Sequence, residues 1–129
     1  MSLRQEYRVA GQAEPISHFT DAVRAGDLLF VSGITAVDEQ GALVGGDDVV
    51  AQARQVFANM GAVLAAAGCS FSDVAKVTVF LTDVDDRPLV NPVRQEVFGA
   101  ARPASTLVEV SALVVPGAKI EVEAIAVVP

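Results

Sequence analysis

The chain has 129 residues, of which 52% are hydrophobic and 19% are charged, so we expect one folded domain over residues 1–129 and exclude intrinsic disorder. Sixteen acidic and nine basic residues leave a net charge of −7, which repels phosphate backbones and argues against a nucleic-acid partner. No apolar run reaches the roughly 18 residues that span a bilayer, and residues 1–7 lack the apolar core of a signal peptide. Because the single cysteine, Cys69, cannot form an internal disulfide, we expect a cytoplasmic protein without membrane contact.

The first half of the chain predicts strands followed by one long helix. Three strands are expected at residues 5–10, 22–25 and 28–32, the last two forming a hairpin because Gly26-Asp27 is a turn signal between apolar runs. The helix follows Gly45-Gly46, with Asp47 or Asp48 as its N-cap. Apolar residues then recur at three- and four-residue steps as far as Ala67, and Gly68 is placed for a left-handed C-cap. The polar residues Gln52 and Asn59 fall mostly off this apolar stripe.

The second half predicts another strand, a shorter helix and two final strands. The segment 74–82 is rich in β-branched residues, and the last two strands are expected at 106–113 and 119–128. Between them, a helix covers roughly 86–98, but an interior Pro92 would remove a backbone hydrogen bond. We therefore expect Asn91 as the N-cap and Pro92 as the first helical residue, with residues 86–90 forming a separate turn.

The last predicted strand has two faces of different character. Alternate residues from Ile120 onward are apolar, whereas the other face carries Glu121, Glu123, Ile125 and Val127. Two helices can cover only one side of such a sheet. The second face needs another cover, and the simplest one is a further copy of the chain, so we predict a homo-oligomer. The alternative is that this patterning arose by chance.

Few residues offer obvious chemistry. One histidine, His18, and one cysteine do not make a common zinc site, and we expect no metal. His18 is expected to be an ordinary loop histidine, and Cys69 a small buried residue. The carboxylates of Glu121 and Glu123 point the same way, and one of them in partly apolar surroundings could act as a general base. From spacing alone, a solvent-exposed or salt-bridged pair is the better interpretation.

Taken together, several motifs resemble the Rid family of reactive intermediate deaminases, also called YjgF or L-PSP endoribonucleases. Each motif is weak alone, but their order and spacing are specific to the fold, and they extend from about Pro15 to Val127. They are AVRAGDLLFVSG (22–33), Gln52-Ala53 with Asn59 and Gly68, VTVFLTD (77–83), Val90-Asn91, Arg102-Pro103-Ala104 and KIEVEAIA (119–126).

The resemblance implies a chorismate-mutase-like α/β (α+β) sandwich, with one mixed sheet of five or six strands and two helices on one face. It also implies a homotrimer that binds a small-molecule ligand in clefts between subunits. Known members hydrolyse enamines and imines, such as 2-aminoacrylate and 2-iminopropionate, to 2-oxoacids and ammonia without a cofactor.

The resemblance also assigns site residues, some kept and some changed. Glu121 matches the glutamate that orients the attacking water, Asn91 the asparagine near the cleft, and Ser32-Gly33 the residues that line it. Ser105 stands where active members carry the arginine that binds the substrate carboxylate, and Phe19 stands where many carry a tyrosine. A hydroxyl cannot replace a guanidinium, which binds a carboxylate through two hydrogen bonds.

Two functional hypotheses follow. The first is an imine or enamine hydrolase with weak or no activity on 2-aminoacrylate, since a neutral or cationic imine suits a cleft without the arginine. The second is a non-catalytic module that binds a small ligand or a partner on the same scaffold. Retained Glu121 favours the first, whereas Ser105 and Phe19 favour the second; a displaced guanidinium from Arg102 is a further alternative. Ribonuclease activity is disfavoured by the charge of −7.

Overall fold

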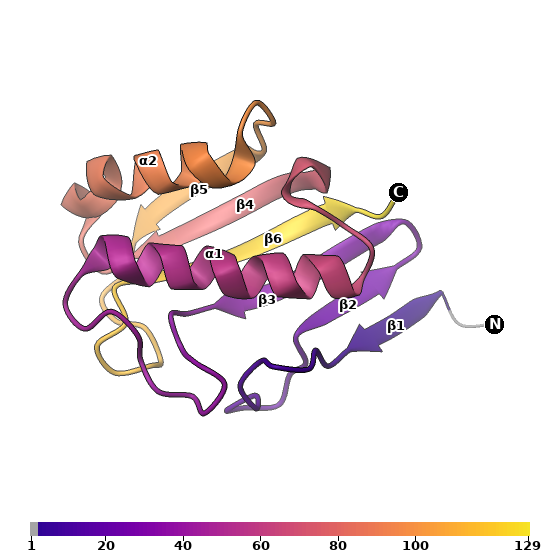
Figure 1. Ribbon diagram of the computed structural model, residues 1–129, viewed down its shortest axis with the longest axis horizontal. Helices are drawn as coiled ribbons and strands as arrows, with labels where there is room; N and C mark the ends of the chain where they lie inside the picture. The colour runs from indigo at the N-terminus through magenta and orange to yellow at the C-terminus, as the bar shows by residue number, and fades with distance from the viewer. Residues whose placement is uncertain (1–2) are drawn as a thin grey trace.

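The computed structural model describes residues 3–129, so Met1 and Ser2 of the expected domain lie outside the described residues. Figure 1 shows one sheet with two helices packed across it. The strands are β1 (Arg4–Tyr7), β2 (Ala22–Ala25), β3 (Leu28–Ile34), β4 (Val74–Leu81), β5 (Ala104–Glu109) and β6 (Ile120–Val127), and the helices are α1 (Val49–Ala66) and α2 (Arg87–Phe98). The order across the sheet is β1-β2-β3-β6-β4-β5, and β4 and β5 are its parallel pair. The expected mixed sheet is confirmed, with six strands.

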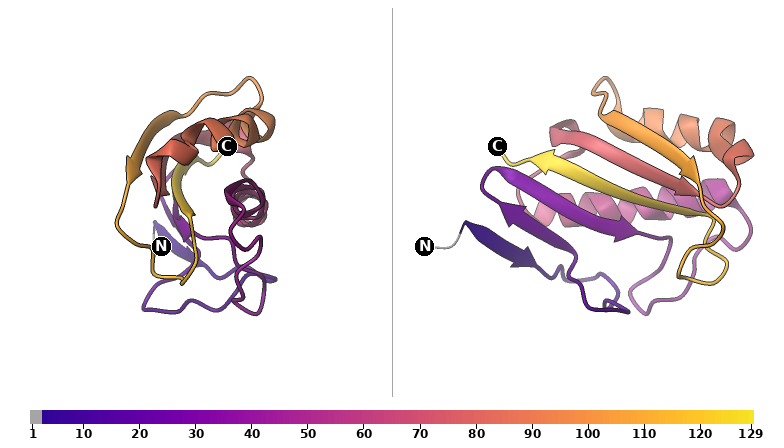
Figure 2. Two further views of the ribbon diagram at one scale, coloured as in Figure 1. Left: turned by 90° about the vertical axis from the view of Figure 1, so that its left-hand side faces the viewer. Right: turned by 180° about the vertical axis from the view of Figure 1, so that it is seen from behind.

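Both helices cover the same face of the sheet, as the two views of Figure 2 show. The alternate residues of β6 are buried beneath the helices, and these residues are Ile120, Val122, Ala124 and Ala126. Met60 and Leu64 of α1 are buried as well. The other residues of β6 point to the open face, as the alternation in the sequence predicts. One apolar layer between helices and sheet therefore forms the core, and the second face of the sheet stays uncovered in a single chain.

Helix α1 begins and ends where the sequence predicts. Of the two candidate caps, Asp48 is the N-cap, and its Oδ1 accepts hydrogen bonds from the backbone N–H groups of Val50 (2.9 Å) and Ala51 (3.2 Å). Gly68 has a φ of 77°, in the left-handed region favoured after a helix end.

One expectation about α1 is wrong: Gln52 was placed off the buried stripe, yet its side chain is fully buried. The Nε2 atom of Gln52 donates to the carbonyls of Gly46 (2.7 Å) and Gly117 (3.0 Å), and its Oε1 accepts from the Lys119 N–H (2.7 Å). These bonds make burial of the amide tolerable and fix the chain just before β6.

The predicted start of the second helix is also wrong. Helix α2 begins at Arg87, so Asn91 is not its N-cap and Pro92 lies inside it. Residues Val84–Asp86 form a short 3-10 turn before it, in place of the separate turn expected at 86–90. Pro92 leaves the carbonyl of Pro88 without its helical donor. Both prolines are exposed, so water can satisfy that carbonyl.

Two strands end three or four residues earlier than expected, β1 by 10 − 7 = 3 and β5 by 113 − 109 = 4. Strand β1 ends at Tyr7 rather than at residue 10, and β5 covers Ala104–Glu109 rather than 106–113. The parallel partner of β5 ends at Leu81, whose carbonyl accepts from the Val110 N–H (2.8 Å), so the ladder has no partner beyond that point. Within residues 3–129, neither helix is long and apolar enough to cross a membrane.

Candidate functional site

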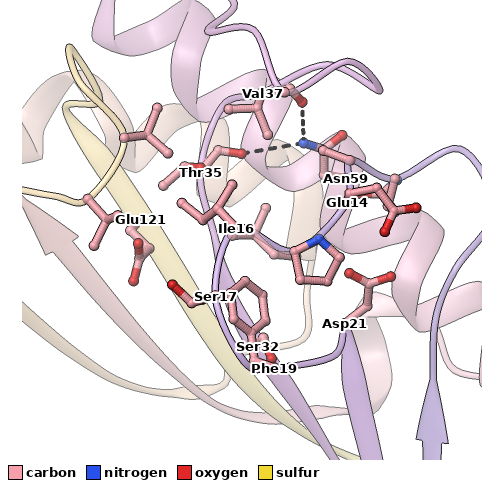
Figure 3. A pocket seen from close by; sticks show the side chains of 18 residues that line it. Glu14, Ile16, Ser17, Phe19, Asp21, Ser32, Thr35, Val37, Asn59 and Glu121 are labelled. Atoms are coloured by element: carbon pink, nitrogen blue, oxygen red, sulfur yellow. Dashed lines mark hydrogen bonds between the residues drawn. The ribbon is translucent and has the colours of Figure 1, made fainter.

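Glu121 lies in a hollow of about 460 Å³ at one end of β3 and β6. The loop between β1 and β2 forms one wall, and Glu121, Ser17 and Phe19 face the same hollow (Figure 3). Four residues singled out from the sequence line it together: Phe19, Ser32, Gly33 and Glu121. The antiparallel pairing of β3 with β6 brings Ser32 and Gly33 close to Glu121, and the loop between β1 and β2 adds Phe19.

Gly33 allows the carboxylate of Glu121 to approach β3 closely. A Cβ atom at position 33 would lie 2.5 Å from Oε2 of Glu121, which is inside van der Waals contact. The pairing of β3 with β6 also shifts register between Val31 and Ile34, so Ser32 and Gly33 lie at an irregularity of the ladder. Such irregularities are common beside active sites because they redirect side chains.

The carboxyl group of Glu121 is half-buried, and this burial raises its pKa. The negative charge of Glu123, two residues along the same face, raises the pKa further. Phe80 of β4 lies directly opposite Glu121 in the sheet. A carboxylate with a raised pKa is a stronger proton acceptor than an ordinary surface glutamate, which suits a general base.

Hydrogen bonds hold the loop wall of the hollow in place. Ser32 Oγ donates to the Thr20 carbonyl (2.6 Å), which ties β3 to the loop. Arg8 Nη1 binds Asp21 Oδ2 (2.6 Å), and the same oxygen accepts from the Val9 N–H (2.7 Å). The charge of Asp21 is thus matched by Arg8, and Glu121 is the carboxylate that faces the hollow without a cation partner among the described residues.

Asn59 closes the far side of this hollow. Its Nδ2 donates to the carbonyl of Val37 (2.9 Å), as Figure 3 shows, and its Oδ1 accepts from Gln55 Nε2 (2.9 Å). Buried Asn59 was placed off the apolar stripe by its sequence position, so this contact was not predicted. Its role in the structure is to hold the segment that follows β3.

The other two predicted site residues lie elsewhere in the chain. Asn91 lines a second hollow, of about 500 Å³, beside the C-terminal half of α2. Ser105, on the edge strand β5, accepts a hydrogen bond of 2.7 Å from Nη2 of Arg94, which lines that hollow. Strand β4 lies between β6, which carries Glu121, and β5. A single chain therefore does not bring Asn91 or Ser105 into the hollow around Glu121.

Arg94 is the residue that the sequence reasoning missed. Its position three residues after Asn91 could have indicated it as a candidate, because residues three apart share one face of a helix. Burial lowers the pKa of the Arg94 guanidinium. Arg102, the guanidinium considered from the sequence, lines the same hollow but is exposed.

The remaining candidates behave as ordinary structural residues. His18 is exposed on the loop and does not line the hollow around Glu121. Cys69 is a free, buried thiol whose pKa is raised by burial, as expected for a small core residue. Within residues 3–129, no group of three or more His, Cys, Asp or Glu side chains is placed to hold a metal ion.

Comparison with known proteins places this chain in a family. The model of the family described as Endoribonuclease L-PSP matches residues 10–128. A RutC family protein of Pyrococcus horikoshii is 42% identical over 113 residues, covering 88% of this chain and 89% of the relative. The human 2-iminobutanoate/2-iminopropanoate deaminase is 36% identical over 126 residues, covering 97% of this chain and 90% of the relative.

One solved structure is similar to this chain in both fold and sequence. The Rid family protein YyfA of Yersinia pestis superposes with a TM-score of 0.91 at 32% identity, covering 97% of this chain and 99% of that one. The expected α+β sandwich of the chorismate-mutase-like type, with one mixed sheet and two helices, is therefore confirmed. The chain belongs to the Endoribonuclease L-PSP family, which is the Rid or YjgF family.

Proposed function

We propose that this protein hydrolyses small enamines and imines to carbonyl compounds and ammonia, with Glu121 activating the water. The observation that carries the proposal is the half-buried Glu121 carboxylate, which stands against Gly33 in a hollow and has a raised pKa. Support also comes from the human relative, which is named as a 2-iminobutanoate/2-iminopropanoate deaminase. The chemistry needs no metal or organic cofactor.

The proposed reaction has two steps. Glu121 accepts a proton from water while the water oxygen bonds to the imine carbon, and passes this proton to the imine nitrogen to give a tetrahedral amino alcohol. The hydroxyl proton of this intermediate is then transferred to the amine nitrogen, again through Glu121, as the C–N bond breaks, so that a carbonyl forms and ammonia departs. An enamine enters this sequence after its carbon is protonated to the imine tautomer.

We propose that the substrate range differs from that of members with an arginine at position 105. Ser105 offers a neutral hydroxyl on β5, and this hydroxyl already accepts a hydrogen bond from Arg94. Bidentate binding of a carboxylate needs two parallel N–H donors, which serine lacks. Phe19 likewise lines the hollow without a hydroxyl of its own. Both differences act on substrate binding and leave Glu121 in place.

We also propose a homotrimer whose clefts lie between subunits. The open face of the sheet exposes apolar side chains, which are Leu28, Phe30, Val108 and Val127, and exposed apolar patches of this kind mark contact surfaces. A ligand can touch Glu121 together with Asn91 or Ser105 only where two copies meet, because one chain keeps them apart. Light scattering of the purified protein tests this, with a mass of three chains of 13.4 kDa expected.

We place this activity in the cytoplasm, where enzymes that use pyridoxal phosphate release such imines. The buried free thiol of Cys69 is consistent with a reducing compartment. Fractionation of cells that express the tagged protein tests the location.

The deciding experiment is an imine hydrolysis assay with the imine generated in situ by an amino-acid oxidase or dehydratase, from neutral and acidic amino acids. We expect ammonia release above background, and a loss of about 10²- to 10⁴-fold in Glu121→Ala, the range typical of a general base. Glu39→Ala is the matched control, because Glu39 is an exposed carboxylate on the turn after β3. It should keep the wild-type rate.

The second candidate function is a non-catalytic ligand-binding module, which the changes at Ser105 and Phe19 favour. It is supported if a correctly folded oligomer accelerates no imine tested, and that result would reject the hydrolase. Cleavage of RNA that depends on Glu121 would instead support a ribonuclease.

A further inference from the structure

The second hollow differs in charge from the rest of this acidic protein. It lies beside the C-terminal half of α2 and the segment that leads to β5, and has a volume of about 500 Å³. Its two charged lining residues are Arg94 and Arg102, and none of the described residues that line it is acidic. The chain as a whole carries a net charge of −7, so a basic hollow of this kind runs against its overall composition.

Arg94 differs from the arginines of this chain that form ion pairs. Arg8 and Arg54 both bind carboxylates, at 2.6 Å and 2.7 Å respectively. Within residues 3–129, the partner recorded for the Arg94 guanidinium is the neutral hydroxyl of Ser105, at 2.7 Å. Burial lowers the pKa of Arg94, and no carboxylate among residues 3–129 forms an ion pair with it. An incoming anion would supply that missing charge.

The hydrogen bond to Ser105 also fixes how the guanidinium is presented. A guanidinium has five N–H donors in one plane, and the bond from Nη2 to Ser105 uses one of them. With one corner held against β5, the remaining donors keep a defined orientation, and a planar carboxylate can bind two of them side by side. Asn91, on the same helix face, offers an amide donor in the same hollow.

We infer that the hollow between α2 and the start of β5 is a binding site for a small organic carboxylate, with the Arg94 guanidinium as the group that binds the anion. The choice of carboxylate rests on the proposed function: the ligand is a 2-imino or 2-oxo acid, and in the homotrimer the Glu121 of a second copy supplies the water. This replaces the expectation of a neutral or cationic imine. That expectation considered only the absence of an arginine at position 105 of β5. The positive charge is instead supplied by Arg94 of α2.

The test is a binding measurement that does not depend on turnover. The probes are 2-oxobutanoate and its neutral analogue 2-oxobutanamide, titrated into the oligomeric protein by calorimetry. The variants are Arg94→Gln, Arg94→Lys and Arg87→Gln. Arg87 is the matched control, because it is an exposed arginine at the start of the same helix and does not line the hollow. Circular dichroism and light scattering confirm that each variant is folded and assembled as the wild type is.

We expect wild type and Arg87→Gln to bind 2-oxobutanoate equally well and to bind it more tightly than the amide. Arg94→Gln should bind 2-oxobutanoate at least about tenfold more weakly, as is typical when a hydrogen bond to a charged group is lost. Arg94→Lys should fall between them, because it keeps the charge but loses the planar pair of donors. Affinity for the amide should not change.

Two results would overturn the inference: equal affinity for 2-oxobutanoate in Arg94→Gln and Arg87→Gln, or no preference for the acid over the amide. The same titration in Glu121→Ala separates this inference from the proposed function. If that variant binds 2-oxobutanoate normally while wild type hydrolyses no imine, the anion site stands and the hydrolase is rejected. If wild type hydrolyses imines but Arg94→Gln is unaffected in binding, the hydrolase stands and the anion site is rejected.

Discussion

The hollow around Glu121 and the hollow beside Arg94 belong to the same sheet but have opposite chemistry. The first is built on β3 and β6 at the middle of the sheet, and its charged lining residues are Glu14, Asp21 and Glu121. The second is built on α2 next to the edge strand β5, and its charged lining residues are both arginines. One offers a proton acceptor and the other an anion-binding group.

The separation of the two hollows has a physical consequence. A guanidinium beside Glu121 would lower the pKa of its carboxyl group and make it a weaker base. With the arginines on another part of the chain, burial and Glu123 act on Glu121 without opposition, and its pKa stays raised. A base and an anion-binding group can then serve one ligand only across a contact between copies.

The strongest way to break this arrangement is to prevent the copies from meeting. Phe30 of β3 is 44% exposed on the open face and lies opposite Ile125. We expect Phe30→Asp to give a folded monomer, because an unpaired buried carboxylate costs several kcal/mol at such a contact. Imine hydrolysis should disappear with the oligomer, since the two hollows no longer face each other. Light scattering and the hydrolysis assay measure both effects.

The control for this change is Leu89→Asp, which places the same charge at a residue of α2 that is 53% exposed, on the helix-bearing side of the sheet. It should remain an oligomer. An oligomeric and active Phe30→Asp variant would show that the open face is not the contact surface.

A smaller change disturbs only the first hollow. In Gly33→Ala, the new methyl group would overlap Oε2 of Glu121 and push the carboxylate away from β3. We expect kcat/KM to fall roughly 10- to 100-fold, since displacement of a catalytic group by about 1 Å can have that effect. Thermal stability should change little, because the atom displaced is the end of a flexible side chain.

The double variant Gly33→Ala with Glu121→Ala tests whether Gly33 acts through Glu121. If it does, adding Gly33→Ala to Glu121→Ala produces no further loss. An additive loss would mean that Gly33 contributes by some other route.

The smallest expected effect concerns the influence of Glu123 on the pKa of Glu121. The charge of Glu123 raises the pKa of Glu121, so Glu123→Gln lowers that pKa toward its ordinary value. Glu121 acts as a base only when deprotonated, and the rise of kcat/KM with pH should therefore begin at lower pH in the variant. The shift should shrink at high ionic strength because Glu123 is exposed to solvent. An unchanged pH profile at low salt would mean that Glu121 is not the titrating group.

Most of the fold could be predicted because local patterns agree with it. The Gly26-Asp27 turn, the Asp48 cap and the alternation along β6 each follow from short-range preferences, and the structure contains all three. Pro92 misled the prediction, since proline disfavours a helix interior, but this proline lies on an exposed side of α2 where water can reach the freed carbonyl.

The site was predictable only in part. The sequence by itself determined the two faces of β6, and its resemblance to the family supplied the candidates Phe19, Ser32, Gly33 and Glu121, which line one hollow. The pairing of β3 with β6 was not predicted. Only the tertiary structure decided that Asn91 and Ser105 lie apart from Glu121, and that Arg94 donates to Ser105. The contact joins a helix to an edge strand 11 residues further along the chain. Packing of α2 over β5 creates it, and no periodicity in the sequence encodes that packing.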